Sequence, residues 1–112
     1  MAWLPCPYLG IDVELTDERV RHIRRRHNDV LTGPGNIIAT TLAEPDRVRR
    51  RESKPDEAIF IREFDEFEAD SFVAVVVRED DPPDDRRPAR HWVVTAYRTE
   101  DEPAIGRIEW IR

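Results

Sequence analysis

Apolar and polar residues alternate over residues 9–15, Leu-Gly-Ile-Asp-Val-Glu-Leu, with the period of two that is typical of a half-buried β-strand. Thr16 and Asp17 follow as candidate N-cap residues, and the apolar positions then take helical spacing. We predict a first helix over Asp17–Asn28. One arc of its helical wheel carries His27 near its middle, together with Val20, Ile23, Val30 and Leu31, while His22 falls on the far side.

Gly33-Pro34-Gly35 is expected to break the chain, and a second amphipathic helix is predicted over Asn36–Glu44, before Pro45. Five further strands are predicted: Arg47–Arg51, Ala58–Phe64, Phe72–Arg78, His91–Thr99 and Gly106–Arg112. Because no helix separates these strands, we expect antiparallel pairing. The pattern predicts an α+β fold in which an N-terminal strand and two helices pack on one face of a four- to five-stranded antiparallel sheet, with an acidic, proline-containing loop at 79–88.

The length of 112 residues suits a single domain over 1–112. Cys6 is the only cysteine, which excludes an intrachain disulfide and favours a reducing, cytoplasmic compartment. No apolar run approaches the roughly 18 residues of a membrane span, and the first residues lack the features of a secretory signal. His22 and His27 are five residues apart and so do not form a His-x-x-x-His pair, and we expect neither a metal nor a cofactor.

Charge is distributed unevenly along the chain. The net charge is −6, but residues 19–51 contain nine arginines against three acidic residues, a local balance of +6, which leaves −12 for the rest. Such asymmetry favours a polyanionic partner such as RNA, although a codon bias toward arginine would also enrich this residue. The candidate phosphate-binding residues are Arg24, Arg26, Arg49 and Arg51.

Candidate chemistry lies on the first helix and on two strands. His27 has the side chain best suited to proton transfer near neutral pH, although a histidine on an apolar arc is also often a satisfied core residue. Strict alternation along His91–Thr99 would place His91, Val93, Thr95, Tyr97 and Thr99 on one face, which is polar enough to bind a ligand or simply to face solvent. Arg62, between Phe60 and Phe64, would stack on a base, neutralise a phosphate, or pair with a neighbouring acid.

Three stretches resemble a known group of proteins. Residues 15–27, Leu-Thr-Asp-Glu-Arg-Val-Arg-His-Ile-Arg-Arg-Arg-His, are similar to the opening motif of the phage-associated barnase-EndoU-colicin-RelE nuclease families. Glu44-Pro45-Asp46-Arg47-Val48 resembles their turn after the second helix, and residues 93–99 resemble their Val-Val-Thr-Ala-Tyr strand. The similarity extends over about residues 15–99.

This resemblance implies a ribonuclease-like fold and a role in toxin, phage or mobile-element biology, with His22, His27, Thr95 and Tyr97 at the positions that match the motifs. The function predicted from the sequence is metal-independent cleavage of RNA, for example a tRNA or mRNA, by attack of the 2′-hydroxyl, with Arg62 as a further catalytic residue. A cognate inhibitor protein is an expected partner. The alternative is a non-catalytic module that binds RNA or protein.

Overall fold

The computed structural model describes residues 2–32, 36–65, 67, 71–82, 84–86 and 89–112. The expected Gly33-Pro34-Gly35 break lies outside these residues, as do parts of the two acidic loops. The elements in chain order are β1 (Ala2–Cys6), β2 (Ile11–Leu15), α1 (Asp17–Arg26), α2 (Asp29–Thr32), α3 (Ile37–Ala43), β3 (Arg47–Arg50), β4 (Glu57–Phe64), β5 (Ser71–Asp80), β6 (Arg90–Thr99) and β7 (Arg107–Ile111).

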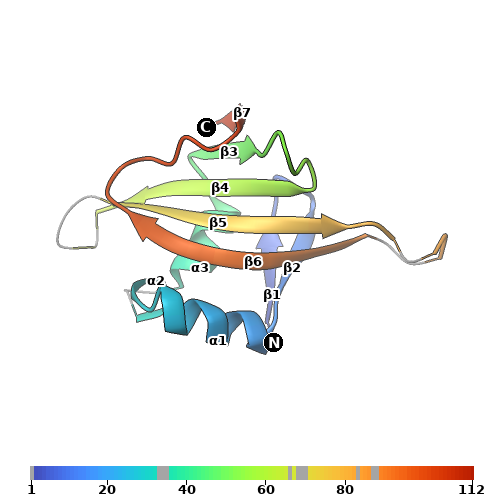
Figure 1. Cartoon of the computed structure of the whole chain (residues 1–112), viewed down its shortest axis with the longest axis horizontal. Coiled ribbons are helices and arrows are strands. Elements are labelled where there is room, and N and C mark those ends of the chain that lie inside the picture. The colour runs from blue at the N-terminus through green and yellow to red at the C-terminus, as the bar shows by residue number, and fades with distance from the viewer. Residues whose placement is uncertain (1, 33–35, 66, 68–70, 83, 87–88) are drawn as a thin grey trace.

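The strands form one seven-stranded sheet in the order β1-β2-β6-β5-β4-β3-β7 (Figure 1). Successive strands from β3 to β6 pair antiparallel, as the sequence predicts. β2, however, lies parallel to β6, in register at Glu14 and Trp92, so the sheet is mixed. The predicted four- to five-stranded antiparallel sheet is therefore wrong, because β2, which was expected to pack with the helices, pairs parallel with β6, and β1 adds a further strand.

The strand β1 is absent from the sequence prediction because its residues, Ala-Trp-Leu-Pro-Cys, show no apolar–polar alternation, and Pro5 argues against a strand. Leu4 and Cys6 are nevertheless buried, and β1 pairs antiparallel with β2 along its whole length. The one-turn helix α2 was also not predicted. β5 continues to Asp80, so the first two residues of the predicted 79–88 loop belong to a strand.

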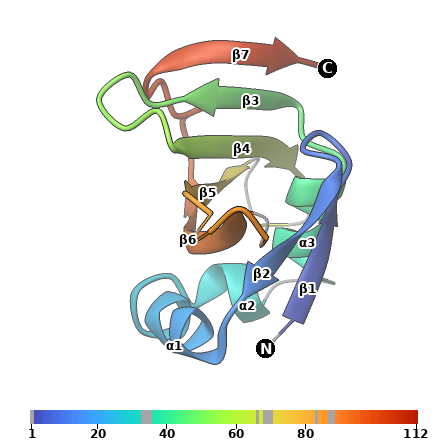
Figure 2. The ribbon, with the colours of Figure 1, turned by 90° about the vertical axis from the view of Figure 1, so that its right-hand side faces the viewer.

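The helices do not pack together on one face of the sheet, which is a second correction. α3 lies over β1, β4 and β5, whereas α1 and α2 contact β6 at the other end of the molecule from β7 (Figure 2). The cause is that β2 pairs with β6 only near Glu14 and Trp92. Beyond Trp92 no strand among the described residues pairs with this edge of β6, and α1 lies along it. There the Arg19 guanidinium donates from Nη1 to the Val94 carbonyl oxygen at 3.1 Å.

Both faces of the sheet contain buried apolar residues. The face toward α3 holds the larger core, in which Phe60, Val75 and Val93 pack with the helix residues Ile23, Ile38 and Leu42. The opposite face, called here the second face, has a small buried cluster of Ile59, Ile61, Ala74 and Val76, with Phe72, Val94 and Tyr97 packed against it. No helix in the described part of the chain is long and apolar enough to cross a membrane.

Candidate functional site

The second face of the sheet carries a buried carboxylate between two arginines. Glu57, the first residue of β4, is 4% exposed, and Arg78 lies opposite it on β5. Arg78 donates from Nη2 to Glu57 Oε2 at 2.5 Å, and Arg51 Nε lies 3.2 Å from Glu57 Oε1. Residues from β4, β5 and the end of β3 therefore meet at one carboxylate. Glu57, Arg51 and Arg78 are called here the carboxylate cluster.

Some buried polar groups on the second face lack a hydrogen-bond partner. Among the described residues these include the Nε atom of Arg49 and the Thr95 hydroxyl oxygen, whereas Nε of Arg51 and of Arg78 lies near a carboxylate, of Glu57 and Asp56 respectively. A buried donor without a partner costs free energy, and such a group in a folded protein often awaits a ligand or water. The ligand that matches several guanidinium groups and a hydroxyl is an oxyanion, for which phosphate is the commonest biological example.

A register shift in β6 determines which of its side chains reach the second face. Val76 pairs with Thr95 but Val77 pairs with Val93, so Val94 is an extra residue on β6. Thr95 and Tyr97 consequently lie on the second face with Trp92 and Val94. The strict alternation assumed from the sequence is wrong here, because the β-bulge places His91 and Val93 on the other face.

His27 comes to the second face from α1. It is the C-cap residue of that helix, and its backbone N–H donates to the Ile23 carbonyl oxygen at 2.6 Å. Its ring centroid lies 5.8 Å from that of Tyr97, at an interplanar angle of 46°. Burial raises the pKa of the Tyr97 hydroxyl, and the charge of Arg51 partly opposes this shift. Tyr97 thus lies beside His27, on the same face of the sheet as the carboxylate cluster.

His22 lies one turn beyond Arg19 on α1 and is partly buried. Burial lowers the pKa of His22, and the charges of Arg19, Arg26 and Arg25 lower it further. Arg24 and Arg26 are exposed on the last turn of the helix, next to His27. Arg19, through the Val94 carbonyl, and His27, through Tyr97, are the α1 residues whose contacts with β6 are defined.

Arg62 does not join this group. It alternates with Ile61 and Glu63 and faces the α3 side of the sheet, where its Nη1 donates to the Glu44 carbonyl oxygen at 2.7 Å. Its guanidinium carbon lies 5.5 Å from the centroid of Phe64, so it stacks on one of the two predicted aromatics. Of the residues singled out from the sequence, the structure places Thr95, Tyr97, Arg49 and Arg51 on the second face and His27 beside Tyr97. His22, Arg24 and Arg26 lie on α1.

Sequence reasoning missed Glu57 and Arg78. A signal was present, because each is a charged residue next to the apolar run of its strand, in register with buried positions: Glu57 with Ile59 and Ile61, and Arg78 with Ala74 and Val76. Such a residue usually needs a partner. The pairing that supplies this partner depends on strand register, which a single sequence does not reveal.

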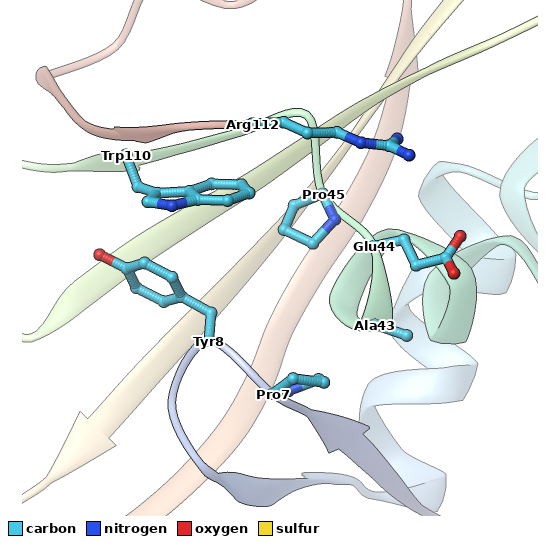
Figure 3. Close-up of a pocket in the computed structure, with 7 residues that line it drawn as sticks. All are labelled: Pro7, Tyr8, Ala43, Glu44, Pro45, Trp110 and Arg112. Carbon is cyan, nitrogen blue, oxygen red and sulfur yellow. The ribbon is translucent and has the colours of Figure 1, made fainter.

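A separate pocket of about 400 Å³ lies on the α3 side of the sheet (Figure 3). Its walls are mainly apolar, and it is lined by Pro7, Tyr8, Ala43, Glu44, Pro45, Trp110 and Arg112. The Tyr8 hydroxyl does not serve a ligand, since it donates to Glu109 Oε2 at 2.7 Å. The histidines, Thr95, Tyr97 and Glu57 all lie elsewhere, so we place the candidate chemistry at the carboxylate cluster and not in this pocket.

Comparison of the chain with protein-family models, with curated proteins and with solved structures finds no match. The resemblance to phage-associated nucleases therefore stays a prediction that depends on the short motifs alone. Within the described residues, no group of three histidine, cysteine, aspartate or glutamate side chains could hold a metal ion.

Proposed function

We propose that the chain is a ribonuclease-like domain whose second face binds RNA and cleaves its phosphodiester bond without a metal ion. The observation that carries the proposal is the position of Glu57 between Arg51 and Arg78, on the face where His27 meets Tyr97. This reaction requires two groups that can transfer protons. It also requires cations around the position of the charged phosphate oxygens. A cytoplasmic tRNA or mRNA would be the substrate.

The reaction would proceed through the 2′-hydroxyl of the RNA. Glu57 removes the hydroxyl proton, the 2′-oxygen forms a bond to phosphorus, and the bond from phosphorus to the 5′-oxygen breaks. His27 gives a proton to that leaving oxygen, and the products are a 2′,3′-cyclic phosphate and a 5′-hydroxyl. Arg51, Arg78 and Arg49 would stabilise the charge of the phosphorane, while Tyr97 and Thr95 orient the substrate.

One observation favours a binding module instead. Both carboxylate oxygens of Glu57 are already close to arginine nitrogens, at 2.5 Å and 3.2 Å, and a carboxylate held in this way is a common structural feature. In that alternative, the same arginines hold RNA phosphates while Glu57 keeps them in place. A cognate inhibitor protein fits either alternative, since it would cover the same arginine-rich face.

The test is cleavage of a mixed RNA pool in the presence of EDTA. The wild-type protein should produce 2′,3′-cyclic phosphate ends, and Glu57→Gln and His27→Ala should each reduce the rate by about two to four orders of magnitude, the usual contribution of a general acid or base. Arg62→Ala is the matched control, because it removes an arginine from the opposite face, and its rate should stay near that of the wild type.

Each other result has a definite meaning. RNA binding without cleavage would establish the binding module, and the absence of both would reject both functions. Loss of cleavage on addition of EDTA would contradict the metal-free mechanism. Thermal melts of all variants identify any loss of rate that comes from unfolding.

A further inference from the structure

Exposed apolar side chains are concentrated at one end of the sheet. Six large hydrophobic residues are exposed among the described residues, and four of them lie within residues 105–111: Ile105 at 36%, Ile108 at 44%, Trp110 at 37% and Ile111 at 58%. Single exposed apolar residues are ordinary, but a contiguous group commonly marks an interaction surface. These four residues, called here the β7 patch, lie on and just before the last strand.

The strand β7 is also an open edge. It is the last strand in the sheet order and pairs only with β3 in the described part of the chain, so the peptide groups along its outer edge are available to another strand (Figures 1 and 2). The other end strand, β1, contains Pro5, which has no N–H to offer, whereas β7 contains no proline. Of the two edges, β7 is the one suited to pairing.

A bulge gathers the isoleucines of β7 on one face. Ile108 lies opposite Arg49, Trp110 opposite Val48 and Ile111 opposite Arg47, so Glu109 is an extra residue on β7. Ile108 and Ile111 consequently lie together on the second face, and Trp110 lies on the other.

We propose that two copies of this chain associate through the outer edges of β7, antiparallel to each other, to form one continuous sheet. Charge selects the register. With Ile108 opposite Ile108 of the second copy, Arg107 of each copy lies opposite Glu109 of the other, an opposite-charge cross-strand pair that adds to the bonds Glu109 makes with Arg50 and Tyr8 in its own copy. A shift of two residues in one direction would place the two Arg107 side chains opposite each other, and a shift in the other direction would do the same to the two Glu109 side chains. Like charges directly opposite each other are unfavourable.

This arrangement has a consequence for the second face. A two-fold axis perpendicular to the sheet relates the two copies, since the strands are antiparallel within one sheet. The second faces of both copies therefore lie on the same side. If that face binds RNA as proposed above, the dimer offers two arginine-rich sites side by side, but the dimer itself does not depend on that function.

The oligomeric state of the full chain tests the inference. Sedimentation velocity over about 1–100 µM should show a monomer–dimer equilibrium for the wild type, since a short edge interface is expected to be weak. Ile108→Glu and Ile111→Glu should each be monomeric over that range, and their melting temperatures should change little because both side chains are exposed. Trp3→Glu is the matched control, since Trp3 is 56% exposed on the other edge strand, and it should dimerise like the wild type.

A wild-type protein that is monomeric at the highest concentration would overturn the proposal. A dimer that persists in both folded isoleucine variants, or one that Trp3→Glu dissociates, would also overturn it, because either result places the contact away from β7. Ile111→Glu keeps the test decisive if Ile108→Glu does not fold.

Discussion

At the scale of single residues, the best-defined polar network outside the carboxylate cluster is centred on Glu109. Arg50 donates to it from Nε at 3.0 Å and from Nη2 at 3.1 Å, and the Tyr8 hydroxyl donates at 2.7 Å. These bonds join the turn after β1 to β3 and β7. Arg50 lowers the pKa of Glu109, while burial and the bond to Glu109 raise the pKa of Tyr8 to about 12.

The raised pKa of Tyr8 predicts a loss of stability at high pH. The folded state holds the phenolic proton more tightly than the unfolded chain does, in which tyrosine titrates near its ordinary value of about 10. The stability that the protonated Tyr8 hydroxyl contributes to the folded state is fully present below about pH 10 and is lost as the pH rises toward about 12. The melting temperature of the wild type should therefore fall over this window.

Tyr8→Phe isolates this effect. Its melting temperature should fall less over the same pH window, and its tyrosinate absorbance should lack the component that titrates near 12. The pKa of Tyr97 is also raised, but Tyr97 is common to both proteins and cancels in the comparison. If the melting temperatures of the wild type and Tyr8→Phe fell equally with pH over this window, the role assigned to Tyr8 would be contradicted.

At the scale of elements, the boundaries of α1 follow from local chemistry. The Thr16 hydroxyl accepts a hydrogen bond from the Arg19 backbone N–H at 3.1 Å, and Asp17 and Glu18 occupy the first turn, where the helix dipole favours negative charge. Three arginines occupy the last turn, where it favours positive charge. This helix positions His27, so its start has consequences at the candidate site.

Thr16→Ala should lower the free energy of unfolding by about 1 kcal/mol, the usual contribution of an N-cap side chain. Thr16→Ser, which keeps the hydroxyl, should stay close to the wild type. Urea denaturation of the three proteins provides the measurement. An equal loss of unfolding free energy in both variants would show that the methyl group of Thr16, and not its capping hydroxyl, stabilises the protein at this position.

The elements also show how far the sequence alone could lead. The strands β4 and β5 were predictable from their runs of apolar residues and β6 from its β-branched and aromatic residues, while α1 and α3 were predictable from their caps and periodicity. β1 was not, because its five residues show no apolar–polar alternation. The placement of Thr95 and Tyr97 on one face was predicted, but the bulge at Val94, which moves His91 to the other face, follows from pairing with β5.

The candidate site was predictable in part for the same reason. The choice of His27, Tyr97 and Thr95 depended on residue type and local pattern, and these residues do come together. Arg62 lies apart from them because alternation within β4 places it on the α3 side, and a sequence does not tell which face of a strand will carry the chemistry. Glu57 and Arg78 meet only through the β4–β5 register, across residues 58–77.

At the scale of the whole molecule, the distribution of charge matters more than the net value of −6. Arginines of β3 and β5 lie on the second face, while other arginines of the sheet pair with acids: Arg47 of β3 with Glu102, and Arg90 and Arg98 of β6 with Glu14 and Asp29. Arginines that face a ligand and those that hold the fold together should thus differ in their effect on binding.

RNA affinity should fall steeply with salt concentration, because each phosphate contact releases condensed counterions. Arg51→Ala should weaken binding across RNA sequences and reduce the slope of log K against log salt by about 0.7, the value for one phosphate contact on a single strand. Arg98→Ala, on the opposite face and paired with Asp29, should leave the slope unchanged. Filter binding at several salt concentrations measures both, and equal slopes for Arg51→Ala and the wild type would place the RNA elsewhere.

The segment 100–106, which leads from the end of β6 to β7 (Figure 1), affects how the molecule can fold. From β3 to β6, each strand pairs with the next strand along the chain. Two other pairings are distant in sequence: residues 51–106 separate β3 from β7, and residues 16–89 separate β2 from β6. Pairings between distant parts of a chain are slow to form because loop closure costs entropy before any contact is gained. The central hairpins should therefore form early in refolding, and the two ends of the sheet should be the last to gain protection from hydrogen exchange.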